Sequence, residues 1–375
     1  TVRALGVTPI FVNQKMGGIL GSVNFSIGGN RVKLSEKIML TKNLSGMLKA
    51  GLSLSRALQV LSRQTQNKYL KKIIEVLSET IDKGGTFSDG LAKYPKVFSA
   101  LFVSMVRAGE ESGGMPNALT EVGINLEKSY ALNKKVKSAM MYPSIIIGAI
   151  FLIGILMFIY VVPTLTKTFK ELGAELPAST RFVIGLSDLI SNHLILLVLG
   201  IAVIIFLVIL AVRLPRSKRA IDWMIIRLPV IGTIVREMNA ARTTRTMASL
   251  LGSGVTISRA ISITKEVLQN VHYKKVMEQV EVVVEKGAPM SSIFKAETKL
   301  YPVMVGEMIE VGEETGNLGS MLLDVALFYE GEVDAKTKDL STIIEPVLMI
   351  FIGAAVGFFA VSMLSPMYSI MDSIS

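Results

Sequence analysis

The 375-residue chain contains no cysteine and only two histidines, and this excludes several kinds of functional site. Without thiols there is no disulfide framework, no thiolate metal site and no cysteine nucleophile. The two histidines, His193 and His272, leave little room for histidine-based metal sites or catalytic triads. We therefore expect no metal site.

The common nucleotide-binding and hydrolytic motifs are also missing. A phosphate-binding loop needs a glycine-rich turn that ends in Gly-Lys-Ser or Gly-Lys-Thr, whereas residues 83–86 read Lys-Gly-Gly-Thr and follow an expected helix. Neither Gly-x-Ser-x-Gly nor His-Glu-x-x-His occurs. We expect no catalytic residue and no cofactor, so an energy-driven process would have to draw its energy from a partner.

Long uncharged runs are what the sequence has in abundance. Half of its residues are hydrophobic and the mean hydropathy is +0.52, which is too apolar for an ordinary soluble domain. Three runs are long enough to cross a bilayer of about 30 Å, at about 1.5 Å of helix per residue. The sequence predicts an all-α, multi-pass membrane protein with transmembrane helices at 143–163, 194–212 and 343–366.

Positive charge predicts the orientation of these spans, because lysine and arginine gather on the cytoplasmic side. Basic residues precede the first span and follow the second: Lys128, Lys134, Lys135, Lys137, Arg213, Arg216, Lys218 and Arg219. The loop 164–193 is electrically neutral, and we expect it outside together with the carboxyl-terminal residues 367–375. The amino-terminal side and residues 213–342 are expected in the cytoplasm.

The sequence repeats itself at a distance of 203 residues, without a gap. Residues 51–57 read Gly-Leu-Ser-Leu-Ser-Arg-Ala and residues 254–260 read Gly-Val-Thr-Ile-Ser-Arg-Ala. Gly-Glu-Glu-Ser-Gly at 109–113 returns as Gly-Glu-Glu-Thr-Gly at 312–316. Leucines and alanines at spacings of three and four predict amphipathic helices within each copy, with Ser88 as one helix cap. We expect two six-helix cytoplasmic bundles, 41–142 and 213–342, each followed by a span, with 194–212 as an extra span.

The Gly-Glu-Glu segments are the most distinctive motif, and two interpretations stay open. The acidic side chains can contact a partner protein or a hard cation such as calcium. Alternatively, the segments are helix–helix turns in which glycines allow a tight bend and the glutamates favour the start of the next helix. The candidate residues are Gly109, Glu110, Glu111, Gly113, Gly312, Glu313, Glu314 and Gly316.

Other candidates lie at the spans and in the first bundle. Glu345 is an ionisable group at the inner edge of the third span, where it indicates a function, an interhelical partner or simple access to headgroup water. Gly353 and Gly357 form a small-residue stripe that allows another helix to approach closely, or that only packs or bends within the monomer.

Positive charge is concentrated in the first bundle. Residues 1–142 carry 20 basic and 9 acidic residues, a net charge of +11, whereas residues 213–342 carry 17 and 16, a net charge of +1. Lys71 and Lys72 are candidates for contact with an acidic partner, anionic lipid headgroups are a second possibility, and a solvated face beside the membrane is a third. No aromatic-basic platform accompanies the charge, so we do not expect nucleic acid.

Segments along nearly the whole chain resemble the F-domain family of bacterial inner-membrane platform proteins, which occur in type II secretion and type IV pilus assembly. The resemblance is carried by residues 48–58, 108–113, 141–143, 162–163, 175–177, 227–232, 254–260, 312–316 and 344–346. Residues 1–12 resemble the end of the family's amino-terminal segment, and we interpret 1–40 as a truncated form of it. The family's Gly-Glu turns and span-starting prolines correspond to Gly109, Glu110, Gly312, Glu313, Pro143 and Pro346.

The resemblance implies a non-catalytic homo-oligomer in the inner membrane. Its implied partners are a cytoplasmic secretion or pilus ATPase, pilin or pseudopilin subunits and other inner-membrane assembly proteins, besides membrane lipid. Whether the machine builds pili, secretes proteins or takes up DNA stays open. The alternatives are a small transporter or channel subunit, which needs polar residues at mid-membrane, and a membrane-bound enzyme.

Overall fold

The structure of the chain is a computed structural model, and it describes residues 31–171, 176–193, 199–200, 202–203, 206–207, 210 and 214–374. Every element within these ranges is a helix, which confirms the all-α class. Residues 1–30 lie outside the described part of the chain. The expected span 194–212 is described only at scattered positions.

The first bundle consists of helices that pack around one apolar core, which includes Leu58, Ile74, Leu77 and Phe102. Its elements are α1 (Leu34–Lys49), α2 (Leu54–Gln64), α3 (Lys68–Asp82), α4 (Phe87–Ala92), α5 (Ala100–Glu111) and α6 (Met115–Ala139). The bundle begins earlier than the expected residue 41, because the Glu36 carboxylate accepts a hydrogen bond from the Lys33 N–H and starts α1 at Leu34.

Side-chain caps set the starts of α2, α3, α4 and α5. The Ser53 hydroxyl accepts from the N–H of Arg56 at the start of α2, and Gly51 takes a φ of +87° in the preceding turn. At α4 the cap is the Thr86 hydroxyl, which accepts from the N–H of Asp89. The expectation of Ser88 as this cap was wrong, because Ser88 already lies inside the helix and is buried.

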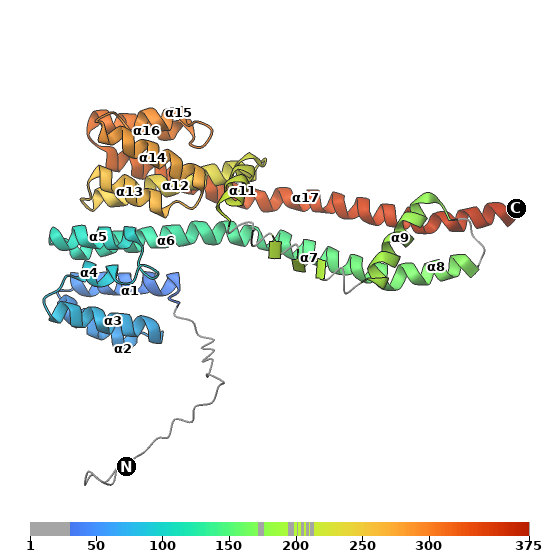
Figure 1. Cartoon of the computed structure of the whole chain (residues 1–375), viewed down its shortest axis with the longest axis horizontal. Coiled ribbons are helices and arrows are strands. Elements are labelled where there is room, and N and C mark those ends of the chain that lie inside the picture. Colours follow the sequence, from blue (N-terminus) through green and yellow to red (C-terminus); the bar gives the residue numbers. More distant parts are fainter. Residues whose placement is uncertain are drawn as a thin grey trace, which may run out of the picture.

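The second bundle begins after α11 (Pro215–Arg227) and has a core of its own, which includes Met277, Phe294, Tyr301 and Ile309. Its elements are α12 (Ile231–Gly252), α13 (Ile257–Val267), α14 (Val271–Glu285), α15 (Ser291–Ala296), α16 (Val303–Thr315) and the start of α17 (Leu318–Ile374). In Figure 1 the two bundles lie side by side at one end of the molecule, with α6 and α12 facing each other.

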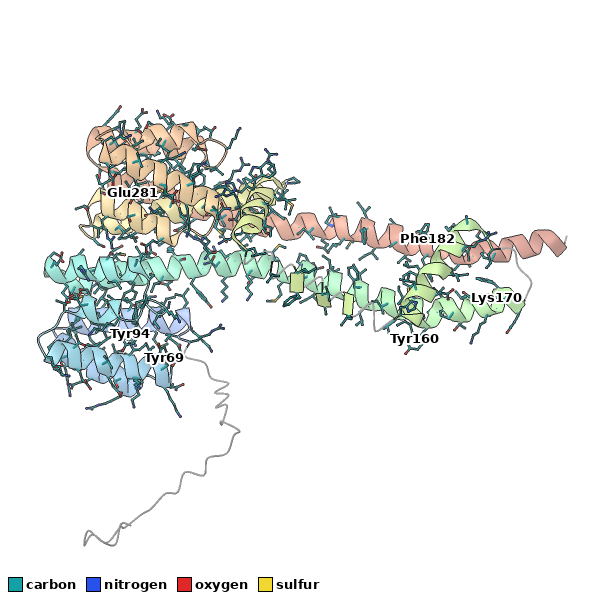
Figure 2. The ribbon with its side chains drawn as sticks, viewed as in Figure 1. Tyr69, Tyr94, Tyr160, Lys170, Phe182 and Glu281 are labelled. Atoms are coloured by element: carbon teal, nitrogen blue, oxygen red, sulfur yellow. The ribbon has the colours of Figure 1, made fainter. Side chains whose placement is uncertain are left out.

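Two long helical arms leave the bundles in the same direction (Figure 1). The first continues from α6 through α7 (Met141–Leu156) and a π-helical segment, Met157–Val161, into α8 (Val162–Glu171), and the second is α17. Both are long and apolar enough to cross a membrane. Many of their apolar side chains are exposed, among them Tyr160 of the first arm, which is labelled in Figure 2. Because large exposed apolar surfaces are costly in water, these arms suit a lipid environment.

The described part of the segment 164–193 is mostly helical, whereas we expected a loop. It contains most of α8 and all of α9 (Ala178–Asn192), and both helices pack on α17 through Phe169, Val183 and Met363. Charge balance had marked this segment only as a connection. The apolar side chains that it buries against α17 come together only in the tertiary structure.

Candidate functional site

The contact between the two bundles brings together helices that lie far apart in the sequence. Helix α6 packs against α12 and α17, and the apolar cores extend across this contact. Leu132 of α6 belongs to the core of the second bundle, whereas Leu250 of α12 and Ile263 of α13 belong to the core of the first. The two bundles therefore share buried apolar surface.

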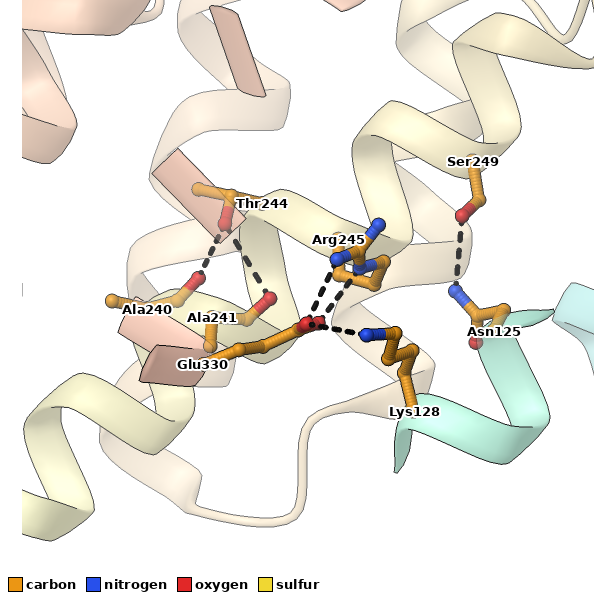
Figure 3. Close-up of polar contacts among 8 residues, drawn as sticks. All are labelled: Asn125, Lys128, Ala240, Ala241, Thr244, Arg245, Ser249 and Glu330. Carbon is orange, nitrogen blue, oxygen red and sulfur yellow. Dashed lines mark hydrogen bonds and ion pairs between the residues drawn. The ribbon is translucent and has the colours of Figure 1, made fainter. Parts of the chain in front are cut away.

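A buried ion pair of the second bundle has a third, basic neighbour from the first bundle (Figure 3). Arg245 of α12 donates to both carboxylate oxygens of Glu330 of α17, with N–O distances of 2.8 and 2.9 Å. Lys128 of α6 approaches the same carboxylate from the other bundle, at 3.8 Å. The two-point geometry suits guanidinium and carboxylate, and burial makes the pairing strongly dependent on both partners.

Further polar contacts extend along the same face of α6. The Asn125 side-chain amide donates to the Ser249 hydroxyl at 3.1 Å, a contact drawn in Figure 3, and Arg242 donates to Asn133 at 3.0 Å. We call this row of contacts, together with Lys128–Glu330–Arg245, the inter-bundle seam.

The seam ends in an ion pair nearer to the membrane arms. Lys135 lies 2.6 Å from Asp334 of α17, and its hydrogen bond lowers the pKa of that carboxyl. From the sequence, Lys128 and Lys135 counted only as charges that orient the membrane spans. The seam was missed because the partners of these α6 residues lie more than 100 residues away in the chain.

The sequence repeat could have indicated the ion pair Arg245–Glu330, because both copies carry a basic and an acidic residue at these positions. Residues 42 and 127 lie 203 positions before Arg245 and Glu330, and Lys42 pairs with Glu127 at 2.8 Å between α1 and α6. Both members of this first-bundle pair are about half exposed, whereas the second-bundle pair is covered by α6. The same ion pair thus holds the first and last helices of each bundle together, and only one copy is buried.

The first glutamate of each Gly-Glu-Glu segment binds the start of a short helix. Glu110 accepts hydrogen bonds from the N–H groups of Phe87 and Ser88 at 2.6 and 3.0 Å, at the start of α4. Glu313 accepts from Met290 and Ser291 at 2.7 and 3.2 Å, at the start of α15. The expectation that these glutamates favour the following helix was wrong for both, because each carboxylate reaches back to an earlier helix.

The remaining residues of these segments have three roles. The first glycine lets two helices approach closely, the last glycine forms the turn, and the second glutamate is exposed. A Cβ at Gly109 would lie 2.2 Å from the Cβ of Ala118, and one at Gly312 would lie 2.9 Å from the Cα of Leu318. Gly113 and Gly316 end their helices at φ of +73° and +69°. Glu111 and Glu314 are exposed.

The other predicted residues lie apart from the seam. Lys71 and Lys72 are exposed on α3, at the outer side of the first bundle. The two prolines lie inside the arms, Pro143 in α7 and Pro346 in α17. The candidates Glu345, Gly353 and Gly357 follow one another along α17, where Glu345 is exposed and a Cβ at either glycine would meet no atom within 4 Å.

A groove of about 810 Å³ opens between the bundles at the end far from the arms. Its walls come from α5 and from the start of α13, and its charged residues are Arg107, Glu111, Arg259 and Glu266. Among the described residues, no three His, Cys, Asp or Glu side chains gather as a metal site would require. The arrangement suits the mechanical joining of two bundles and the binding of protein surfaces.

Comparison with known proteins agrees with this geometry. A family model described as type II secretion system, protein F, matches residues 40–163 and 243–366, two ranges that are offset by the same 203 positions. The chain is 37% identical over 344 residues to the type IV pilus assembly protein PilC of Thermus thermophilus. This alignment covers 91% of this chain and 84% of the Thermus protein.

Two further relatives cover the whole chain. The type IV pilus assembly protein PilC of Myxococcus xanthus is 32% identical over 373 residues, with 100% of this chain and 89% of that protein covered. The type II secretion system protein F of Aeromonas hydrophila is 30% identical over 382 residues, with 100% and 96% covered. With both halves matched and the relatives aligned over nearly their full length, the chain belongs to the type II secretion system protein F family.

Proposed function

We propose that this protein is an inner-membrane platform of a type IV pilus or type II secretion machine, without catalysis of its own. In this role a cytoplasmic ATPase acts on the two bundles, and the membrane arms pass the movement to pilin or pseudopilin subunits. The relatives named for pilus assembly and for type II secretion support this role.

The observation that carries the proposal is the inter-bundle seam. It joins α6 and α17, the two helices that continue from the bundles into the apolar arms. A force applied to either bundle therefore reaches both arms through direct contacts between packed helices instead of through a flexible linker. Packed helices of this kind move as rigid bodies.

The proposed topology has three crossings, with both bundles in the cytoplasm and residues 164–193 and 367–375 outside. The distribution of basic residues along the sequence supports it. We further propose that several copies associate with one another, with anionic lipid and with other inner-membrane assembly proteins.

The test of motor docking uses charge reversal on the outer side of the first bundle. Lys71→Glu together with Lys72→Glu should weaken co-purification of the motor ATPase, because the glutamates that replace these exposed lysines of α3 would repel an acidic partner surface. The matched control is Lys274→Glu with Lys275→Glu, the equivalent positions in the second bundle. Equal binding by both variants and the parent chain would remove this docking site from the proposal.

ATP turnover tests the non-catalytic part of the role. The purified chain in detergent should not hydrolyse ATP, and adding the chain to the motor should change the motor's turnover. Hydrolysis by the chain alone, retained through a second purification step, would contradict the proposal.

A further inference from the structure

The contact between the bundles pairs different faces of the repeated unit. The first bundle contributes its α5/α6 face, with Asn125 and Lys128, whereas the second contributes α12 and α13, with Ser249, and the side of α17 that carries Glu330. The contact is therefore head-to-tail and leaves one face of each kind unused. The unused faces are identified by shifting the residue numbers by 203.

The unused face of the second bundle is apolar and exposed. Its positions equivalent to Ala100, Ala108 and Asn125 are occupied by Val303, Val311 and Phe328, which are 62%, 43% and 49% exposed. We call Val303, Val311 and Phe328 with their neighbours the α16/α17 face. Large apolar side chains in place of alanine and asparagine are unusual on a surface that meets only water.

The unused face of the first bundle lies on α1 and α2. Residues 42 and 46 are equivalent to Arg245 and Ser249, which α6 covers, yet Lys42 and Gly46 are exposed. Two apolar side chains accompany them, Met39 at 65% exposure and Leu52 at 36%. We call these four residues and their neighbours the α1/α2 face.

Charges on the two unused faces are opposite in sign. At the positions equivalent to Ser104, Arg107 and Glu111, which line the groove between the bundles, the α16/α17 face carries three glutamates. These are Glu307, Glu310 and Glu314, and Lys295 pairs with the first two. The corresponding groove positions of the α1/α2 face, equivalent to Arg259 and Glu266, are both arginine, Arg56 and Arg63. Opposite charges steer such surfaces together and disfavour the pairing of like faces.

We propose that the α16/α17 face of one copy binds the α1/α2 face of a second copy, repeating between chains the contact that joins the bundles within one chain. Because both arms run in the same direction, a second copy added in this way keeps its arms parallel to those of the first (Figure 1). With parallel arms, both copies can span the same membrane. A head-to-tail contact of this kind closes into a ring when its rotation divides a full turn evenly.

This proposal names the two faces through which the copies associate, whereas the proposed function states only that several copies associate. It rests on the proposed function only in placing the two copies in one membrane. Its test needs neither motor nor pilin, so that its failure is distinguishable from a failure of the proposed coupling.

The absence of native cysteine makes the contact directly testable. The seam contact between Asn125 and Ser249 is equivalent to a contact between Phe328 of one copy and Gly46 of the next. One tagged chain carries Phe328→Cys and a differently tagged chain carries Gly46→Cys, and both are co-expressed at full length in membranes. A Cβ at Gly46 meets no atom within 4 Å, so this substitution fits the fold.

Mild oxidation should shift the co-expressed pair from monomer to a disulfide-linked dimer that contains both tags. Either variant alone should stay monomeric, and so should Val282→Cys, a 49% exposed position on α14, when paired with Gly46→Cys. A reference chain with Asn125→Cys and Ser249→Cys should form its disulfide within one chain, which shows that the conditions suffice.

Two outcomes would overturn the proposal. One is a dimer formed by Phe328→Cys alone at the yield of the mixed pair, which indicates like faces in contact. The other is no mixed dimer in a preparation where the Asn125–Ser249 reference disulfide forms. A second variant, Phe328→Lys, should shift the detergent-solubilised parent oligomer toward monomer, whereas Val282→Lys should leave its mass unchanged.

Discussion

At the scale of single residues, the two Gly-Glu pairs perform the same task in both bundles. Each glycine lets two helices approach, and each glutamate then reaches the start of a short helix. A carboxylate at this place meets unpaired N–H groups and the positive end of the helix dipole. The first glutamate is thus occupied within the fold, while Glu111 and Glu314 are exposed and remain candidates for a partner.

Neutralising the occupied glutamates should destabilise the bundles. Glu110→Gln and Glu313→Gln keep one acceptor but lose the charge, so each should lower the free energy of unfolding by about 1 kcal/mol. Thermal unfolding in detergent, followed by circular dichroism, measures this as a lower midpoint. The control Glu111→Gln changes an exposed carboxylate and should leave the midpoint unchanged. A similar drop for all three variants would argue against the capping role.

Adding one methyl group at the close approach should also destabilise the first bundle. In Gly109→Ala the new Cβ would lie 2.2 Å from that of Ala118, so α5 and α6 must separate, at a cost of about 1–3 kcal/mol. Gly123→Ala on the neighbouring helix α6 is the control, because a Cβ there would have its nearest neighbour at 3.7 Å. Chemical unfolding in detergent compares the two, and equal stabilities would contradict a tight crossing at Gly109.

At the scale of helices, the repeat places one ion pair in two environments. Arg245 and Glu330 join α12 and α17 beneath α6, whereas Lys42 and Glu127 join α1 and α6 at an exposed surface. A buried charge that loses its partner is costly, and an exposed one is hydrated by water. Equivalent residues in the two bundles should therefore respond differently to the same substitution.

Glu330→Ala should cost about 3–5 kcal/mol, because it leaves Arg245 buried without its carboxylate. Glu127→Ala should cost less than about 1 kcal/mol. The measurement is thermal unfolding of both variants, with limited proteolysis to detect separation of the bundles. If Glu127→Ala proves as damaging as Glu330→Ala, burial by α6 does not decide the strength of the pair.

At the scale of the whole molecule, the two arms extend in the same direction from a pair of bundles that share apolar surface. This shape suits a body that lies on one side of a membrane and reaches the other through α7, α8 and α17. Lys170, at the far end of the arms in Figure 2, and Lys71, on the first bundle, are then separated by the bilayer.

Cysteine labelling in intact cells tests this separation. A membrane-impermeant maleimide should label Lys170→Cys from outside and should label Lys71→Cys only after the inner membrane is opened, because the bilayer blocks its access to the cytoplasm. The cysteine-free parent chain provides the background. Labelling of both positions from the same side would contradict the proposed topology.

Local patterns were enough to predict the class of fold and the repeat. Helical spacing, apolar run length and turn residues act over a few positions, so an all-α chain with long apolar helices follows from sequence. The offset of 203 residues is a property of the sequence itself and locates both Gly-Glu segments. Helix starts were less certain, as Thr86 in place of Ser88 shows, because neighbouring hydroxyls compete for the same N–H groups.

Contacts between distant segments were decided only by the tertiary structure. Both copies of the repeat carry a basic and an acidic residue at the ion-pair positions, and nothing in either copy tells which pair α6 will cover. The sequence also does not tell which helix Glu110 will cap. It caps α4, which begins at Phe87, 23 residues earlier in the chain. Sequence alone determined the all-α class, the repeat and the apolar arms, because these depend on near neighbours. The burial of Glu330 and the exposure of Phe328 depend on which faces of the two bundles meet, and that choice exists only after both have folded.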